Sequence, residues 1–308
     1  MQHLRSLEDC SLDASWVTIG SFDGVHRGHQ AIIRTLSQRA QANQVPSVVV
    51  TFFPHPAVVL GKTAGPHYLT MPEQRAVIFA DLGVDIVITL AFSRKLAELT
   101  ALEFMELISN HLGVKNLWVG KGFRMGRNRQ GEIETIKKIG KQLGYEVQIF
   151  SNVTIDNHRI SSSQIRKSLS EGDVRQAAAL LGRNYAVLGN VVHGAGRGKT
   201  LGYPTANLET PADQLIPMPG VYATWIWVNN IKHSSISSIG YNPTFPSPQP
   251  TLRIESHLIN FDEDIYNTHV ELQFVDFIRP EQKFDSAAAL INQMDQDKSM
   301  AEEVLSNE

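Results

Sequence analysis

Cysteine is nearly absent from this chain, since Cys10 is the only one among 308 residues. A single cysteine forms no disulfide within the chain and supplies no cysteine cluster for zinc. Long apolar runs are also missing, because no stretch approaches the roughly 20 apolar residues that span a bilayer. The first ten residues contain acidic side chains and no apolar core, unlike a secretion signal. We therefore expect a cytoplasmic protein that does not enter membranes.

An excess of charge of one sign is missing as well. The formal net charge is −3, and charged residues make up 19% of the chain. This balance provides no general attraction for nucleic acid or anionic membranes, so neither is an expected partner. The hydrophobic content of 42% indicates a globular protein, and 308 residues are enough for two domains of ordinary size. The sequence does not define an oligomeric state.

The first half of the chain alternates apolar runs with helical patterns. The runs, each typical of a buried strand, are 17–20, 47–53, 85–90, 115–119 and 146–150. Helical patterns lie between them at about 29–43, 72–82, 100–112 and 131–143, and several end near a glycine. This alternation predicts a parallel sheet covered on both faces, with a ligand site beyond the carboxyl ends of the strands.

Two histidines follow the first predicted strand. His26 and His29 stand three residues apart at the start of a helical pattern, with Gly28 between them. Exposed backbone N–H groups and the helix dipole at such a position favour an anion. Surface histidines without a function and a metal site are the alternatives, but a metal site needs further ligands that no cysteine cluster supplies. We favour phosphate binding.

Two further loops follow strands of this half. Residues 119–129 form a glycine-rich loop with four basic side chains, Arg124 among them. Such groups suit a triphosphate or a flavin phosphate, although a solvated loop has the same composition. Residues 51–56 end in two prolines around His55, which is typical of a rigid turn.

A serine-rich segment comes near the end of this half. Ser161 and Ser162 precede a helical stretch that includes Arg166. Ser161 and Gln164 fit a capping box, which is a structural role. Hydroxyls, exposed N–H groups and an arginine at one helix start also suit a phosphate, and we favour that function. A second helix is predicted from Val174 to Leu181.

The second half has a different pattern. Predicted strands at 186–192, 221–228, 234–239, 253–260 and 269–277 are separated by turns rich in proline and glycine. Few helices intervene, so the strands should be antiparallel, and a small closed barrel is expected. A helix is predicted at about 286–297. We place the domain boundary near 182–184.

The most chemically specified segment of the chain is Gly189–Asn207. It contains five glycines, at 189, 194, 196, 198 and 202, so its backbone can approach a ligand closely. It is not a P-loop, because Leu201 and Gly202 follow Lys199 and Thr200 where a helix would begin.

Two oxygen-bearing side chains close this segment. Thr205 and Asn207 stand two residues apart and point the same way if the chain is extended. Their hydroxyl and amide oxygens are hard donors of the kind that Mg²⁺ takes while it shares its shell with water and nucleotide phosphates. The alternative is a hairpin in which both side chains satisfy their own backbone.

Glu255 and His257 share one face of the strand predicted at 253–260. One interpretation is a solvent-facing pair. The other is that they line a barrel mouth, where Glu255 would take a hydroxyl proton during phosphoryl transfer. The residues alone leave both open.

The loops of the first half resemble the nucleotidyltransferase superfamily. His26-Arg27-Gly28-His29 matches its His-x-Gly-His motif, and residues 22–26 are similar to the bacterial FAD synthetase branch. The resemblance implies that His26, His29 and Arg166 act on ATP during adenylyl transfer. It also implies nucleotide or phosphate contacts, at Gly20, Phe22, Gly28, Ser161, Ser162 and Arg124. Two positions depart from the family pattern, since Gly122 stands where a polar side chain is expected and Met125 where an aromatic is expected.

The second half resembles riboflavin kinases. Residues 201–207 and 255–261 match two of their motifs, although Lys199 replaces the usual Arg and Asn260 the usual Asp. The resemblance implies that Thr205 and Asn207 hold Mg²⁺ with ATP and that Glu255 is the catalytic base. The remaining implied contacts are to phosphate, at Gly194, Gly198 and Lys199, and to flavin, at Asn242 and His257.

Six motifs occur in the family's order from about residue 16 to 297, so the chain resembles the prokaryotic bifunctional riboflavin kinase/FMN adenylyltransferase (FAD synthetase) family. The resemblance implies an α/β Rossmann-like nucleotidyltransferase domain over 1–183, then a small antiparallel β-barrel riboflavin kinase domain with a C-terminal helix over 184–308. It implies riboflavin, FMN and ATP as ligands, with Mg²⁺. Two alternatives stay open: a riboflavin kinase whose adenylyltransferase domain is weakened or inactive, and a flavin- or nucleotide-binding regulator without turnover.

Overall fold

The structure is a computed structural model that describes residues 1–63, 67–150, 154–155, 158–194, 202–241 and 252–308. Its contacts divide the chain into two compact units, Met1–Ser162 and Ser163–Glu308. The boundary predicted near 183 lies beyond two helices, α7 (Ser162–Ser170) and α8 (Val174–Leu181). Helix α8 packs against two strands of the second unit. No helix among the described residues is long and apolar enough to cross a membrane.

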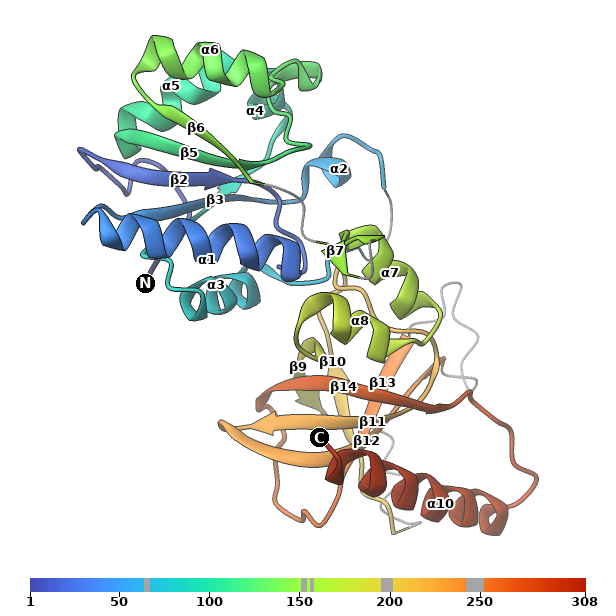
Figure 1. Cartoon of the computed structure of the whole chain (residues 1–308). Helices are drawn as coiled ribbons and strands as arrows, with labels where there is room; N and C mark the ends of the chain where they lie inside the picture. Colours follow the sequence, from blue (N-terminus) through green and yellow to red (C-terminus); the bar gives the residue numbers. More distant parts are fainter. Residues whose placement is uncertain (64–66, 151–153, 156–157, 195–201, 242–251) are drawn as a thin grey trace. The chain divides into compact units, whose positions relative to one another are not determined.

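The first unit is built on a parallel sheet, as the sequence predicts, but the sheet has six strands where five were predicted (Figure 1). Its strands are β1 (Gln2–Leu4), β2 (Ser15–Ile19), β3 (Ser47–Phe53), β4 (Ile86–Ala91), β5 (Val114–Gly120) and β6 (Glu146–Phe150). Their spatial order is β1-β4-β3-β2-β5-β6. The chain runs from β2 to β3 on one side, while β5 lies on the other side of β2, so the order reverses there. A ligand site is expected at the carboxyl ends of β2 and β5.

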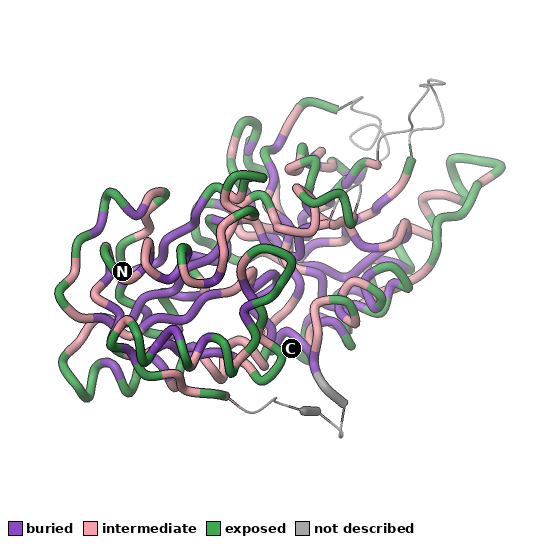
Figure 2. Tube along the Cα trace, turned by 90° about the horizontal axis from the view of Figure 1, so that it is seen from above, coloured by how far each residue is buried: buried purple, intermediate pink, exposed green. Residues whose placement is uncertain are grey.

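Helices cover both faces of this sheet (Figure 1). Helices α1 (Arg27–Ala42) and α3 (Pro72–Asp81) lie on one face, and α5 (Ala101–Leu112) and α6 (Ile133–Leu143) on the other. Successive valines of β3 pack on opposite faces of the sheet, because side chains alternate along a strand. Val49 packs with Ile33 and Phe79, and Val50 belongs to the apolar core on the face covered by α5. Figure 2 shows buried segments in the interior and exposed segments at the periphery.

Short elements were not predicted from the sequence. They are β1, the single turns α2 (Pro56–Val59) and α4 (Arg94–Glu98), the 3₁₀ turn η1 (Arg127–Arg129), and the strands β7 (Thr154–Ile155) and β8 (His158–Arg159). Elements of two to five residues carry too little periodicity to be recognised. The longer helices end as expected, with Gly113 and Gly144 in the left-handed conformation after α5 and α6.

The second unit is a closed antiparallel barrel of six strands, which confirms the predicted architecture. The strands are β9 (Tyr185–Val192), β10 (Ala206–Glu209), β11 (Gly220–Val228), β12 (Ile231–Tyr241), β13 (Leu252–Leu258) and β14 (His269–Arg279). Their order around the barrel is β10-β13-β12-β11-β14-β9, closed by pairing of β9 with β10. The four-residue β10 was not predicted, yet it completes the barrel and carries Asn207.

The C-terminal helix α10 (Ala287–Ser306) packs against β11, β12 and β14. It begins where the sequence predicts, because the Ser286 side chain accepts a hydrogen bond from Ala289 N and caps it. It continues well past the predicted end at 297. Ala301 and Leu305 in the added turns are buried against Ala223.

Candidate active sites

His26 and His29 lie side by side at the start of α1. His26 is the N-cap, and its Nδ1 accepts a hydrogen bond of 3.3 Å from the His29 backbone N–H. The two rings stack with centroids 3.6 Å apart. The ring of His26 also rests over Gly28, where an added Cβ would lie 3.1 Å from it. A neutral His26 ring that accepts at Nδ1 carries its proton on Nε2 and can donate there.

His29 is a neutral hydrogen-bonding group. Burial, together with the neighbouring His26, holds the pKa of His29 well below the usual 6.5. Its Nδ1 is buried and has no hydrogen-bond partner among the residues that the structure describes. The ring of Phe22 meets it edge-on at 5.2 Å. His29 can therefore act on a phosphate at pH 7 by donating a hydrogen bond, without a charge of its own.

The loop that leads into α1 has an unusual backbone. Phe22 and Val25 have positive φ angles of 47° and 40°, which side chains other than glycine rarely adopt. The buried Asp23 carboxylate accepts hydrogen bonds from the backbone N–H groups of Leu69 and Thr70, at 3.0 and 3.2 Å. The surrounding chain thus holds the loop in a strained conformation.

Two of the predicted phosphate-binding residues contact this loop directly. The Phe22 ring lies over Gly20, where an added Cβ would come within 2.9 Å of it. Ser162 Oγ donates a hydrogen bond of 2.9 Å to the Asp23 carbonyl. Gly20, Phe22 and Ser162 are therefore near neighbours, as are His26, Gly28 and His29.

Arg75 is a buried residue of this region that the sequence did not reveal. Its Nη1 donates to the Ser21 carbonyl at 2.6 Å, and its Nη2 donates to the Phe52 carbonyl at 3.2 Å. Burial lowers the pKa of Arg75, and the charge of Asp23 opposes that shift. Arg75 ties the chain after β2 to the end of β3. The one signal was an arginine within the apolar pattern of α3.

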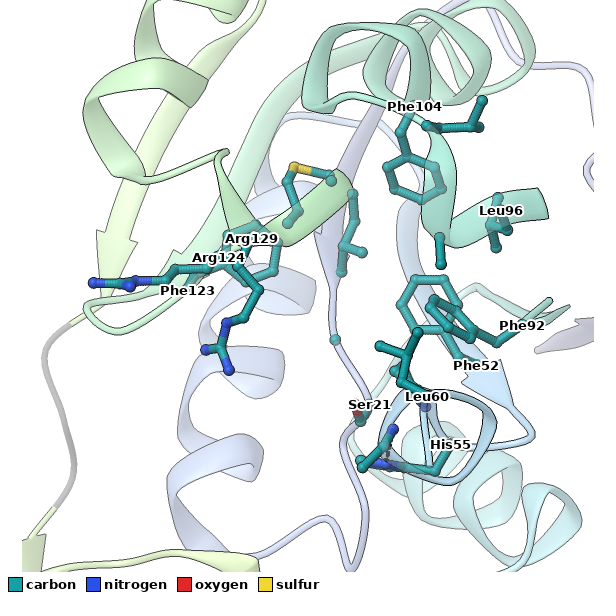
Figure 3. A pocket seen from close by; sticks show the side chains of 18 of the residues that line it. Ser21, Phe52, His55, Leu60, Phe92, Leu96, Phe104, Phe123, Arg124 and Arg129 are labelled. Carbon is teal, nitrogen blue, oxygen red and sulfur yellow. Dashed lines mark hydrogen bonds between the residues drawn. The ribbon is translucent and has the colours of Figure 1, made fainter. Parts of the chain in front are cut away.

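A pocket of about 790 Å³ opens at the carboxyl ends of β2, β3 and β5. The rings of Phe52, Phe92 and Phe104 lie along one side of it, and the guanidinium groups of Arg124 and Arg129 lie on the other (Figure 3). An apolar aromatic wall opposite two cations suits a flat aromatic ligand that carries an anionic group. Of the predicted phosphate-binding residues, Gly20 and Arg124 line this pocket.

Both positions that depart from the family pattern also line this pocket. Met125 is 8% exposed, belongs to the apolar core, and pairs with Gly131 through the backbone. It therefore fills the expected aromatic position with another apolar side chain. Gly122 has no positive φ, so its backbone would accept a polar side chain without strain.

Two further residues predicted for this site, Ser161 and Arg166, lie at helix α7. Ser161 precedes α7, and Arg166 lies within that helix. The contacts assign Arg166 to the second unit, so its role toward the histidines stays a prediction.

The second unit brings Thr205, Asn207 and Glu255 together. Asn207 and Glu255 are direct cross-strand partners on β10 and β13. Thr205 Oγ1 lies 3.5 Å from Glu255 Oε2, at the outer limit of a hydrogen bond. These side chains lie on the outer face of the barrel, since Ile254 and Ser256 point inward. Glu255 therefore faces outward and has the two neighbours that the resemblance implied, and its role as the base stays a prediction.

Gly194 of the glycine-rich segment lies against the Asn207 side chain. A Cβ added at Gly194 would lie 2.2 Å from Asn207 Nδ2, so only a glycine lets the chain pass so close to this amide. The hydroxyl, amide and carboxylate form a set of hard oxygen donors, which fits Mg²⁺ that takes its other ligands from phosphates and water. Among the described residues, no group of three or more histidine, cysteine or acidic side chains forms a metal site.

His257 supports the segment that leads into β10. Its Nδ1 donates a hydrogen bond of 2.8 Å to the Pro204 carbonyl, and the Tyr203 ring meets its ring at 5.0 Å. A role toward flavin stays a prediction. Three further predicted residues, Gly198, Lys199 and Asn242, lie outside the described residues.

Comparison with known proteins defines the class of each half. The FAD synthetase family matches residues 9–164, and the riboflavin kinase family matches residues 181–305. These are two transferase domains that act on flavins, one after the other in a single chain.

Whole-length relatives carry both domains. The bifunctional riboflavin kinase/FMN adenylyltransferase of Listeria monocytogenes is 38% identical, over 92% of this chain and 90% of its own. That of Escherichia coli K12 is 33% identical, over 97% and 96%. The chain belongs to the bifunctional riboflavin kinase/FMN adenylyltransferase family. A crystal structure named as a macrolide-efflux protein from Streptococcus pneumoniae superposes with a TM-score of 0.87 at 31% identity, over 97% of this chain and 98% of that one.

Proposed function

We propose that each unit of this enzyme carries one activity of its family. The barrel unit phosphorylates riboflavin to FMN, and the parallel-sheet unit transfers the adenylyl group of a second ATP to FMN, which gives FAD. The observation that carries the first assignment is the meeting of Thr205, Asn207 and Glu255 across β10 and β13. The second is supported by the aromatic and cationic pocket, which is lined by Gly20 and Ser21 of the chain that leads to the α1 histidines.

In the kinase reaction, the riboflavin 5′-hydroxyl attacks the γ-phosphorus of ATP. As the new O–P bond forms and the bond to the bridging oxygen breaks, Glu255 accepts the hydroxyl proton and ADP leaves. The exposed Glu255 carboxylate is reachable from solvent and stands beside Thr205. Thr205 and Asn207 would hold Mg²⁺, which would withdraw charge from the phosphate oxygens when bound.

In the adenylyl transfer, a phosphate oxygen of FMN attacks the α-phosphorus of ATP, and pyrophosphate leaves. The N–H groups at the start of α1 and the neutral His29 donate hydrogen bonds to the phosphate oxygens while charge builds up on them. No protein nucleophile is needed, because positioning and charge stabilisation suffice for this class of reaction. Arg124 and Arg129 hold the FMN phosphate at the mouth of the pocket.

The principal test is to incubate the purified protein with Mg-ATP and either riboflavin or FMN, and to separate the flavins by chromatography. We expect FAD from both substrates. Two matched variants assign the units: Glu255→Gln should abolish FMN formation from riboflavin yet leave FAD formation from FMN, and His29→Asn should do the reverse. Loss of both activities in either variant would contradict separate sites.

The alternatives give different results in the same assay. FMN that accumulates without FAD would identify a kinase with an inactive first unit, and Gly122→Asp should then raise FAD formation. No turnover of either substrate would leave a flavin- or nucleotide-binding regulator. The buried Met125 and the unstrained Gly122 both support an active first unit.

We also propose a cytoplasmic location. The only cysteine, Cys10, is buried and free, as expected of a protein that keeps its thiol in a reducing compartment. ATP, riboflavin and FMN as substrates fit that location. Detection of the protein in the soluble fraction of lysed cells, with none in a secreted fraction, is the expected result.

A further inference from the structure

The C-terminal helix reaches the segment that carries the kinase site. The hydroxyl of Tyr203 donates a hydrogen bond to the Asp295 carboxylate on α10. Tyr203 is buried, and it stands two residues before Thr205. Neither Asp295 nor α10 was part of the site expected from the sequence.

Three consecutive residues are fixed at this point. The Tyr203 hydroxyl is bonded to Asp295, the Pro204 carbonyl accepts from His257 Nδ1 at 2.8 Å, and Thr205 Oγ1 lies 3.5 Å from Glu255. The second and third contacts come from β13, whereas the first comes from α10. Two separate elements, the strand and the helix, therefore hold the segment.

Helix α10 is itself firmly attached, so Asp295 is held on a rigid frame. Two residues from Asp295, the buried Asp297 carboxylate accepts three hydrogen bonds from the Arg279 guanidinium, at 2.7 to 3.1 Å. Gln293 Nε2 adds a bond of 3.0 Å to Asp297. A bidentate arginine–carboxylate pair fixes direction as well as distance.

A tyrosine hydroxyl carries its proton at neutral pH, because its ordinary pKa is about 10. The hydroxyl thus remains a donor, and a buried donor that loses its acceptor is costly to leave unpaired. Without Asp295 the segment would shift to find another partner.

We propose that Asp295 is a positioning residue for riboflavin phosphorylation, acting through Tyr203 to hold Thr205 against Glu255. This inference rests on the proposed kinase function of the second unit. Because the contact orients groups that act on the phosphate, its loss should lower kcat, while KM for riboflavin stays unchanged. We expect a loss of kcat on the order of tenfold, the size typical of a hydrogen bond to a charged group.

The test compares five variants with the unmodified protein: Asp295→Ala, Asp295→Asn, Tyr203→Phe, the Asp295→Ala/Tyr203→Phe double variant, and Glu302→Ala. Glu302 is an exposed carboxylate on the same helix, so its variant controls for the loss of one charge from α10. Riboflavin phosphorylation is measured with varied riboflavin and ATP, and FMN adenylylation by the same preparations serves as an internal control.

We expect Asp295→Ala and Tyr203→Phe to lose similar amounts of kcat and the double variant to lose no more than either. Asp295→Asn should recover most of the activity, because its amide oxygen still accepts the hydrogen bond. Adenylylation should be unchanged in all five variants. Unaltered kcat in Asp295→Ala, or additive losses in the double variant, would refute the inference. Equal losses of both activities would indicate general destabilisation and refute it too. Absence of FMN formation by the unmodified protein would overturn the proposed function instead.

Discussion

Substitution of Gly194 by alanine is a sharp test of the kinase site, because it moves one side chain of that site without removing a functional group. The new Cβ would lie 2.2 Å from Asn207 Nδ2, whereas ordinary contact begins at 3.4 Å. The Asn207 amide must therefore retreat by about 1.2 Å, the difference between these distances. Gly194 has no positive φ, so the alanine adds no backbone strain. A displacement of about 1 Å at a phosphoryl-transfer site costs on the order of 100-fold in rate.

The assay measures kcat and KM for riboflavin phosphorylation by Gly194→Ala over a range of Mg²⁺ concentrations, with FMN adenylylation as the internal control. We expect phosphorylation to fall about 100-fold and adenylylation to stay unchanged. Gly189→Ala, on the preceding strand β9, is the matched control, because its Cβ would meet the Glu209 carbonyl at 3.1 Å and needs a shift of only a few tenths of an ångström.

Displacement of Asn207 is expected to account for the whole loss, and a double variant tests this directly. In an Asn207→Ala background the amide is gone, so adding Gly194→Ala should cost nothing further. A further loss in that background would show that Gly194 acts through another group. Full activity of Gly194→Ala in the otherwise unmodified chain would show that Asn207 has no role in phosphoryl transfer.

Three further predictions concern other contacts. Gly28→Ala places a Cβ 3.1 Å from the His26 ring, so FAD formation from FMN should fall roughly fivefold while FMN formation from riboflavin is kept. The pKa of His29 is lowered on folding, so the unfolded state binds a proton more readily and the free energy of unfolding decreases as the pH falls below 6.5. Urea unfolding should show a decrease of at most about 1.4 kcal/mol per pH unit below that value, and His29→Gln should remove it. Asp297→Ala leaves the Arg279 guanidinium unpaired and should lower the free energy of unfolding by about 3–5 kcal/mol in the same measurement, whereas an unchanged value would mean that the pair is dispensable.

The sequence was sufficient for the architecture because both halves have strong periodic patterns. Apolar runs such as 47–53 were confirmed as strands, and glycines such as Gly113 end helices as expected. The contacts of Thr205, Asn207 and Glu255 agree with the grouping that the motifs implied. This grouping was predictable because Thr205 and Asn207 are close in the sequence and Asn207 pairs with Glu255 across two neighbouring strands.

The orientation of Glu255 could not be predicted in the same way. Alternation places Glu255 and His257 on one face of β13, but it does not state which face points into the barrel. That choice depends on the closure of the barrel by the four-residue β10, which has too few residues for a periodic signal. The inward face of β13 includes Ser256, whose hydroxyl bonds Ser237 inside the barrel, so polarity alone gave no indication.

Arg75 and Asp295 explain why the remainder of each site was missed. Arg75 bonds the Ser21 carbonyl, 54 residues away, and Asp295 accepts from Tyr203, 92 residues away. Each belongs to a helix whose pattern gives it no distinguishing context, and each bonds a backbone carbonyl or a side chain that is distant in the sequence. Their contribution exists only once the helix has docked on its unit. In both units, a packed helix therefore holds a loop or segment that lies next to predicted site residues. Substitutions at such helix positions should change catalysis without touching a substrate.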